Sequence, residues 1–234
     1  MMTWVDVAFN NHVRIIAKRS YDKTIDVSFG VYEGGEKDGW LTINLKPSKG
    51  GLDWFINLLG YLTPPLALDG GWVHRGYWGE ITHYWPEFIG VIYDTPELTK
   101  AMQNGVIISG RSKGAAEAVL IAYRMWTPGI KMEVGAVEPP RFCSYQLAKR
   151  IEATIGRNII TYTIYKNDIV PGLPKWFTIP GFGYQIGKRK AGLSIKDHIE
   201  ATTKQEVIDE GLKPYEAEYK AQAHKLKEEI FKEQ

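Results

Sequence analysis

The residues with the clearest capacity for chemistry lie in the stretch 106–124, which reads VIISGRSKGAAEAVLIAYR. A β-branched apolar run leads into Gly110-Arg111-Ser112-Lys113-Gly114, and small apolar residues follow it. This order predicts a strand, a sharp turn and a helix, with Ser112 in the turn. A strained turn needs little bulk two residues before and after its serine, which the two glycines supply. The Ser112 hydroxyl would then be available as a nucleophile, and the helix N-terminus would point N–H groups at a developing oxyanion.

A simpler interpretation of the same pentapeptide is an ordinary turn in which Ser112 caps the following helix. That interpretation does not explain why both Gly110 and Gly114 are needed. It also leaves unexplained why the helix that follows has such small side chains.

A serine hydroxyl needs a base, and histidine is the usual one because its pKa lies near neutrality. In α/β hydrolases the chain order is serine, acid, histidine. Asp168 follows the predicted strand 158–165, at the end of a strand where parallel sheets place their sites. His198 and His224 are the histidines downstream of it.

His224 lies in a charged terminal stretch, which favours a solvated position, whereas His198 follows a Gly-rich irregular segment and could sit on a loop over the sheet. We therefore predict a catalytic triad of Ser112, Asp168 and His198. Asp197 is interpreted as a loop or capping residue, because sequence neighbours seldom adopt triad geometry.

The oxyanion would need at least two hydrogen-bond donors. One is the backbone N–H of Lys113, directly after the nucleophile. The other is expected from the loop 46–49, after the predicted strand 40–45, where Ser48 could offer its hydroxyl and its backbone N–H.

Length and composition limit the class of protein. The chain has 234 residues, 44% hydrophobic and 24% charged, which fits a single domain, 1–234, with a sizeable core. A formal charge of +2 gives no argument for a nucleic-acid partner. One cysteine, Cys143, excludes an intramolecular disulfide and is interpreted as a small buried hydrophobe.

Targeting and metal-binding signals were not found in the sequence. The N-terminus lacks a basic patch followed by an apolar run, and no stretch reaches the ~20 apolar residues of a membrane span. We therefore expect a soluble protein, cytoplasmic or otherwise. His74 and His83 lack the partners of a zinc site, so no zinc site is expected in this stretch, and His74 is interpreted as a structural histidine.

The remaining pattern alternates strands and helices, which predicts an α/β fold with a mainly parallel central sheet and helices on both faces. The expected strands are two antiparallel ones within 13–31 at the sheet edge, then 40–45, 106–108, 131–137 and 158–165. The expected helices are 86–104 with a new start at Pro96, the helix after Ser112, 145–155 and a charged terminal helix, 213–234, with 176–192 irregular.

The segment 52–62, LDWFINLLGYL, has two interpretations that the sequence leaves open. It could be a core helix, or it could be a mobile amphipathic lid with hinges at Gly50-Gly51 and Pro64-Pro65. Its apolar side chains at near-helical spacing are Trp54, Phe55, Leu58 and Leu59.

Taken together, these motifs resemble those of the class 3 lipases, the fungal-lipase-like branch of the α/β hydrolases, over about 40–198. GRSKGAA around Ser112 is similar to the family's G-H-S-L-G-A-A, and residues 73–77 to its V-H-x-G-F. Residues 137–142 resemble its Pro-Arg stretch, and 167–174 its N-D-x-V-P-x-L-P, whose aspartate is the triad acid. Asp197-His198 resembles its D-H, whose histidine is the triad base. Ser48 with Asp53-Trp54 resembles the oxyanion residue before a D-W lid helix.

The resemblance implies hydrolysis of carboxylic esters, of lipid-like acyl chains above all, through an acyl-serine. It implies a lid over an apolar pocket, transient contact with a lipid interface, and no cofactor or metal. The chain departs from the family at Arg111 and Lys113 around the serine and at Lys46-Pro47 before the oxyanion residue, where proline lacks an N–H. An amidase or acyltransferase on the same triad, or a non-catalytic binding protein, remains an alternative, and the oligomeric state is open.

Overall fold

A seven-stranded sheet forms the centre of the computed structural model, which describes residues 3–21, 23–47, 64–215 and 217. The strand order is β1-β2-β3-β6-β7-β8-β9. β1 and β2 pair with their neighbours in antiparallel fashion, and β3, β6, β7, β8 and β9 run parallel to one another. A small hairpin, β4-β5, is separate. The strands are β1 Val13–Tyr21, β2 Ile25–Tyr32, β3 Leu41–Pro47, β4 Leu66–Leu68, β5 Gly71–Val73, β6 Val106–Arg111, β7 Met132–Val137, β8 Ile160–Tyr165 and β9 Phe182–Ile186.

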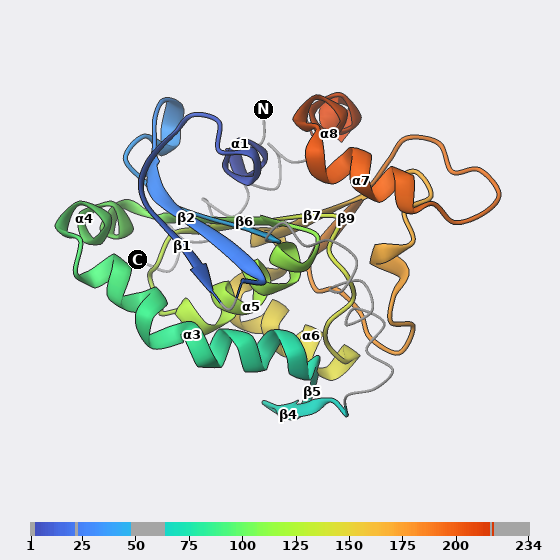
Figure 1. The fold of residues 1–234 in the computed structure, drawn as a ribbon, viewed down its shortest axis with the longest axis horizontal. Helices are drawn as coiled ribbons and strands as arrows, with labels where there is room; N and C mark the ends of the chain where they lie inside the picture. The colour runs from blue at the N-terminus through green and yellow to red at the C-terminus, as the bar shows by residue number, and fades with distance from the viewer. Residues whose placement is uncertain (1–2, 22, 48–63, 216, 218–234) are drawn as a thin grey trace.

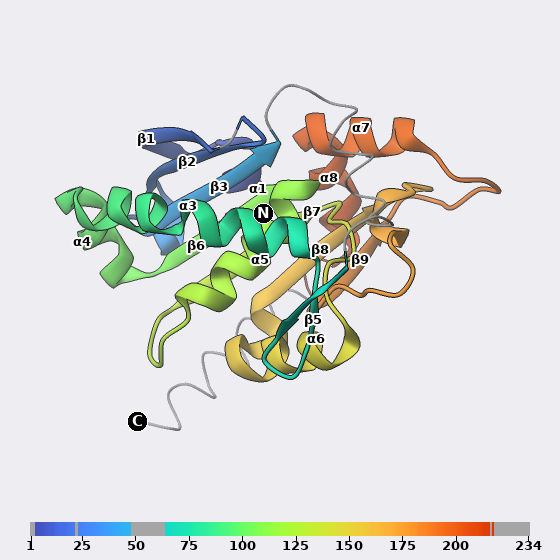
Figure 2. The same cartoon turned by 60° about the horizontal axis from the view of Figure 1, so that its bottom comes forward.

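Helices cover both faces of the sheet, so the predicted α/β fold is confirmed (Figure 1). α1, α7 and α8 lie on one face, and α3, α5 and α6 lie on the other. In Figure 2, α3 and α5 lie side by side across their face. The helices are α1 Thr3–Phe9, α3 Arg75–Tyr93, α4 Pro96–Asn104, α5 Lys113–Met125, α6 Tyr145–Ile151, α7 Ile195–Thr203 and α8 Gln205–Leu212. No helix among these described residues is long and apolar enough to cross a membrane.

The central strands are buried on both faces, because helices pack on each side of them. Adjacent residues of β6 show this: Ile108 packs into the larger core under α3 and α5, whereas Ile107 packs into the core under α1 and α8. A strand alternates its side chains between faces, so a continuous apolar run is needed here. The two cores hold β6 at the middle of the sheet, and the predicted sharp turn around Ser112, here called the elbow, follows directly from it.

Two sequence predictions about the elements were wrong. The helix expected at 86–104 begins at Arg75 instead, passes through Pro86 and ends at Tyr93, before α4 starts at Pro96 as expected. The aromatic stretch before Pro86 is helical because Tyr77, Ile81, Tyr84 and Phe88 form one buried face.

The segment 176–192 was expected to be irregular but contains β9, the strand at the other edge of the sheet. Its glycines hid the strand signal, and its pairing with β8 is a tertiary contact. Gly183 is needed there because an added Cβ would lie 2.5 Å from the Tyr162 ring.

Candidate active site

The turn between β6 and α5 holds Ser112 in a strained backbone conformation, with φ 54° and ψ −125°. A Cβ on Gly110 would lie 2.2 Å from the carbonyl oxygen of Gly114, and one on Gly114 would lie 2.5 Å from the carbonyl oxygen of Leu45. Only glycine fits at either position, which explains the spacing of the pentapeptide. Ser112 occupies the position before α5, but its side chain makes no capping hydrogen bond. The simpler capping interpretation is therefore wrong.

The three residues predicted as a triad lie within hydrogen-bonding distance of one another. His198 Nε2 is 2.8 Å from Ser112 Oγ, and His198 Nδ1 is 2.6 Å from Asp168 Oδ2. All three are buried, with 2%, 6% and 2% exposure for Ser112, Asp168 and His198. A buried carboxylate on Nδ1 fixes the tautomer that leaves Nε2 free to take a proton from the serine. This arrangement can activate Ser112 as a nucleophile.

Asp168 is oriented by the turn that follows β8. Its backbone N–H donates to the carbonyl oxygen of Tyr165, and its Oδ1 accepts from the N–H of Val170 at 2.8 Å. One carboxylate oxygen is therefore held by the backbone, and the other is directed at His198. The site lies at the carboxyl ends of the parallel strands, as expected for such a sheet.

His198 was expected on a loop but lies in the first turn of α7. Ser194 caps this helix, because its Oγ accepts from the N–H of Asp197 at 3.0 Å. The sequence contained this signal as Ser194-Ile195-Lys196-Asp197, a serine followed three residues later by an acid. Asp197 accepts from the N–H of Asn167 at 3.1 Å and so helps to position the turn that carries Asp168.

Glu138 is a buried carboxyl group that the sequence analysis did not identify as part of the site. It follows β7 with φ 52°, is 0% exposed, and accepts the N–H of Tyr165 at 2.8 Å. Burial and the neighbouring Asp168 carboxylate raise the pKa of Glu138 well above its usual range. The raised pKa favours the neutral form of Glu138, which would keep a second negative charge away from Asp168, the predicted triad acid. The sequence signal that could have identified Glu138 is its place at the carboxyl end of a buried strand, next to the strand that leads into the elbow.

The side chain of Lys113 lies in a buried ionic cluster with two glutamates. Its ammonium group contacts Glu80 and lies 3.6 Å from Glu117, which also accepts a 3.0 Å hydrogen bond from the Tyr84 hydroxyl. Glu117 is fully buried, and this desolvation raises its pKa to about 8, although Lys113 opposes the shift. Lys113, which departs from the family pattern, is therefore paired with glutamates on α3 and α5.

Only part of the predicted oxyanion site falls in the described residues. The backbone N–H of Lys113 is the first of α5, and such N–H groups have no intrahelical carbonyl partner. Leu45 of β3 pairs with Gly110, so the end of β3, up to Pro47, lies beside the elbow. Ser48 lies outside the described residues, as do the predicted lid residues Trp54, Phe55, Leu58 and Leu59.

The other sequence candidates lie in packing positions. His74 is buried and stacks on Tyr77 with ring centroids 4.2 Å apart. Cys143 is buried, as predicted, and burial raises the pKa of its thiol. Across the described part of the chain, no group of three His, Cys, Asp or Glu side chains is suited to a metal ion. His224 lies outside that part.

Comparison with known proteins decides the family. The family model described as lipase (class 3) matches residues 42–178, more than half of the chain. The chain belongs to the class 3 lipase family. It is a carboxylic ester hydrolase of the lipase type. Among curated proteins, none matches this lipase in a sequence search.

Solved lipase structures share its fold. The lipase from Rhizopus microsporus var. chinensis has 17% identity and a TM-score of 0.62, covering 82% of this chain and 70% of that one. A fungal lipase in complex with an inhibitor has 18% identity and a TM-score of 0.65, with 84% of each chain covered. A triacylglycerol lipase, described as having a serine-protease triad as its catalytic centre, has 22% identity and a TM-score of 0.61, covering 76% and 68%.

Proposed function

We propose that this class 3 lipase hydrolyses lipid-like carboxylic esters through an acyl-serine formed on Ser112. The observation that carries the proposal is a pair of buried hydrogen bonds. One joins Ser112 Oγ to His198 Nε2, and the other joins His198 Nδ1 to Asp168 Oδ2. The preference for lipid-like acyl groups is supported by the solved relatives, which are lipases, one of them a triacylglycerol lipase.

In the acylation step, Ser112 Oγ attacks the carbonyl carbon of the ester while His198 Nε2 takes the hydroxyl proton. The carbonyl oxygen becomes an oxyanion, which the N–H of Lys113 and the predicted donors of Ser48 would stabilise. The C–O bond to the alcohol then breaks, and the alcohol leaves with the proton held by His198. An acyl group remains on Ser112.

In the deacylation step, His198 takes a proton from water, and the resulting nucleophile attacks the acyl carbon. The tetrahedral intermediate collapses to release the carboxylic acid, and the proton returns to Ser112. Asp168 remains hydrogen-bonded to His198 Nδ1 in both steps and stabilises the imidazolium form of His198. No step requires a cofactor.

The test compares hydrolysis of p-nitrophenyl butyrate and p-nitrophenyl palmitate by the wild type and by Ser112→Ala. Loss of the nucleophile should lower kcat on the order of 10⁶-fold. Ser109→Ala is the matched control, because this serine lies on the same strand and donates to the carbonyl oxygen of Gly135. It should retain activity. A fluorophosphonate should add its mass to the wild type and not to Ser112→Ala.

Activity that survives in Ser112→Ala would refute the assignment of the nucleophile. Nothing in the described residues or the comparisons supports the amidase, acyltransferase or binding-protein alternatives. The corresponding anilides, and an added alcohol as acyl acceptor, belong in the same assay. Faster cleavage of anilides than of esters, or a wild type that cleaves neither, would overturn the proposed function. A preference for butyrate over palmitate would refute the lipid-like substrate class.

A further inference from the structure

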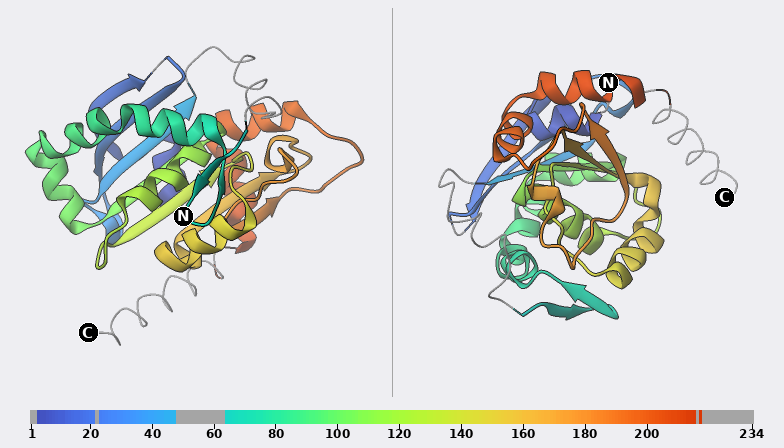
Figure 3. Two further views of the ribbon diagram at one scale, coloured as in Figure 1. Left: turned by 90° about the horizontal axis from the view of Figure 1, so that it is seen from below. Right: turned by 90° about the vertical axis from the view of Figure 1, so that its right-hand side faces the viewer.

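The segment between β9 and the first turns of α7 projects from the body of the molecule (Figures 1 and 3). This segment combines basic with apolar residues. Exposed large apolar side chains gather here. Leu193, Ile195 and Ile199 are 75%, 45% and 57% exposed. Exposing several large apolar groups within seven residues costs free energy in water, and such patches mark interaction surfaces.

The same segment is strongly cationic. Residues 187–200 hold four basic side chains, Lys188, Arg189, Lys190 and Lys196, and two acidic ones. Both acidic side chains have partners other than these four basic residues. Asp197 accepts a hydrogen bond from the backbone N–H of Asn167, and Glu200 lies 3.5 Å from the ammonium group of Lys166. No ion pair involves the four basic residues within the described part of the chain. Their charge is therefore available to an anionic partner.

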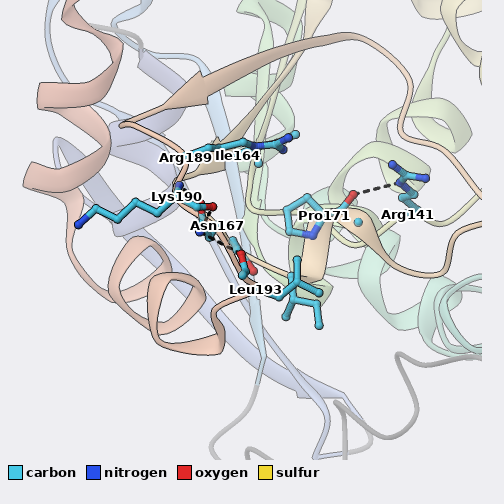
Figure 4. Close-up of a pocket in the computed structure, with 11 residues that line it drawn as sticks. Arg141, Ile164, Asn167, Pro171, Arg189, Lys190 and Leu193 are labelled. Atoms are coloured by element: carbon cyan, nitrogen blue, oxygen red, sulfur yellow. Dashed lines mark hydrogen bonds between the residues drawn. The ribbon is translucent and has the colours of Figure 1, made fainter.

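A pocket of about 380 Å³ lies at the base of this segment, and its lining includes Arg141, Asn167, Arg189 and Lys190 (Figure 4). Asn167 fixes the segment here, because its side-chain amide donates to the carbonyl oxygens of Lys190 and Gly192 at 2.7 and 2.9 Å. In Figure 4 the Lys190 side chain extends outward, away from Arg141 and Pro171. The pocket is large enough for a phosphate-sized head group, and its lining holds two arginines, Arg141 and Arg189, together with the Asp168 carboxylate.

We infer that residues 188–199 form a docking surface for anionic lipid, with the basic side chains contacting head groups and the apolar ones entering the acyl boundary. The inference rests on the proposed function, since it identifies the surface at which the enzyme would meet its substrate. A soluble polyanion would match the charge but would leave Leu193, Ile195 and Ile199 exposed. A lipid surface satisfies both features.

The position of this surface relates it to catalysis. Ile195 and Ile199 lie four residues apart on α7, on neighbouring turns of one face, and His198 is in the same helix. With a rise of about 1.5 Å per residue, both lie within roughly 5 Å of His198 along the helix axis. Docking through this face would bring His198, the proposed general base, close to the lipid surface.

The experiment measures binding to vesicles by sedimentation, using Ser112→Ala so that no lipid is consumed. Vesicles of phosphatidylcholine alone are compared with vesicles that also contain phosphatidylglycerol. The triple variant Lys188→Gln/Arg189→Gln/Lys190→Gln should bind the anionic vesicles roughly 100-fold more weakly, because each basic side chain contributes about fivefold. Leu193→Gln/Ile199→Gln should also bind more weakly. Added salt should weaken binding of the parent protein to anionic vesicles, because it screens the basic side chains, and should have little effect on the triple variant, which lacks three of them.

A matched control removes three exposed lysines elsewhere, Lys18→Gln/Lys100→Gln/Lys131→Gln, and should bind as the parent does. In the active background, the patch variants should hydrolyse monomeric p-nitrophenyl butyrate at the wild-type rate. That second assay separates failure of this inference from failure of the proposed function.

Three results would overturn the inference. The first is equal binding to neutral and anionic vesicles. The second is equal binding of the triple variant and its control. The third is binding to heparin as strong as to vesicles and insensitive to Leu193→Gln/Ile199→Gln, which would indicate a polyanion site.

Discussion

Replacing Glu117 by glutamine should change how the stability of this fold depends on pH. Glu117 lies in α5, one turn after Lys113, and is fully buried. Desolvation raises its pKa from about 4.5 to about 8, and this outweighs the opposing effects of Lys113 and the Tyr84 hydroxyl. The folded state therefore holds a proton on Glu117 that the unfolded state has lost above pH 5.

The magnitude follows from proton linkage. Each bound proton that differs between the two states changes the free energy of unfolding by about 1.4 kcal/mol per pH unit. The unfolded chain binds fewer protons through this window, so Glu117 makes the fold less stable as pH rises from 5 to 8. The loss over that range is on the order of 3 kcal/mol, given the pKa of about 8. Glutamine has no charge and can still accept from Tyr84, so Glu117→Gln should lack this loss.

Urea unfolding of the wild type and Glu117→Gln at pH 5, 6, 7 and 8 tests the reasoning. The free energy of unfolding of the variant minus that of the wild type should rise steadily with pH. Glu97→Gln is the control. Arg14 lowers the pKa of this exposed carboxyl group below its usual value, so its titration falls below the window. A difference between wild type and Glu117→Gln that stays constant from pH 5 to 8 would show that Glu117 does not hold a proton in the fold.

Three further predictions concern the site. Asp168→Asn should lower kcat on soluble esters by about 10⁴ with an unchanged melting temperature, because the wrong tautomer of His198 is favoured; a loss under tenfold would remove Asp168 from the triad. Glu138→Gln should keep near-wild-type kcat at pH 7, because the raised pKa of Glu138 favours its neutral form, whereas a large loss would indicate that its negative charge is required. Gly114→Ala should destabilise the fold by about 3 kcal/mol in urea unfolding, since its Cβ would overlap the Leu45 carbonyl, and unchanged stability would contradict the packing described.

The sequence was informative where structure and chemistry are local. The elbow could be predicted because strand, glycines, serine and small-sided helix are consecutive, and steric demands act within five residues. The buried strands β6, β7 and β8 could be predicted because a strand covered on both faces must be apolar throughout. Asp168 could be proposed from the position of a strand end alone.

The helix starting at Arg75 and the edge strand β9 were not predicted correctly, for different reasons. Pro86 was interpreted as a helix start, although the buried face that defines α3 begins with Tyr77 and includes aromatic residues. β9 has a weak intrinsic signal and is formed by its pairing with β8. Local propensity is overruled in both cases by packing against distant residues.

By itself, the sequence determined which residue types could form a serine, histidine and aspartate site and in which order they occur along the chain. Only the tertiary structure decided their geometry, because Ser112 and His198 are 86 residues apart and meet only when α7 packs at the carboxyl ends of the strands. It also decided the environments of Glu117 and Glu138. A pKa depends on burial and on neighbouring charges, and both are set by residues brought together through folding.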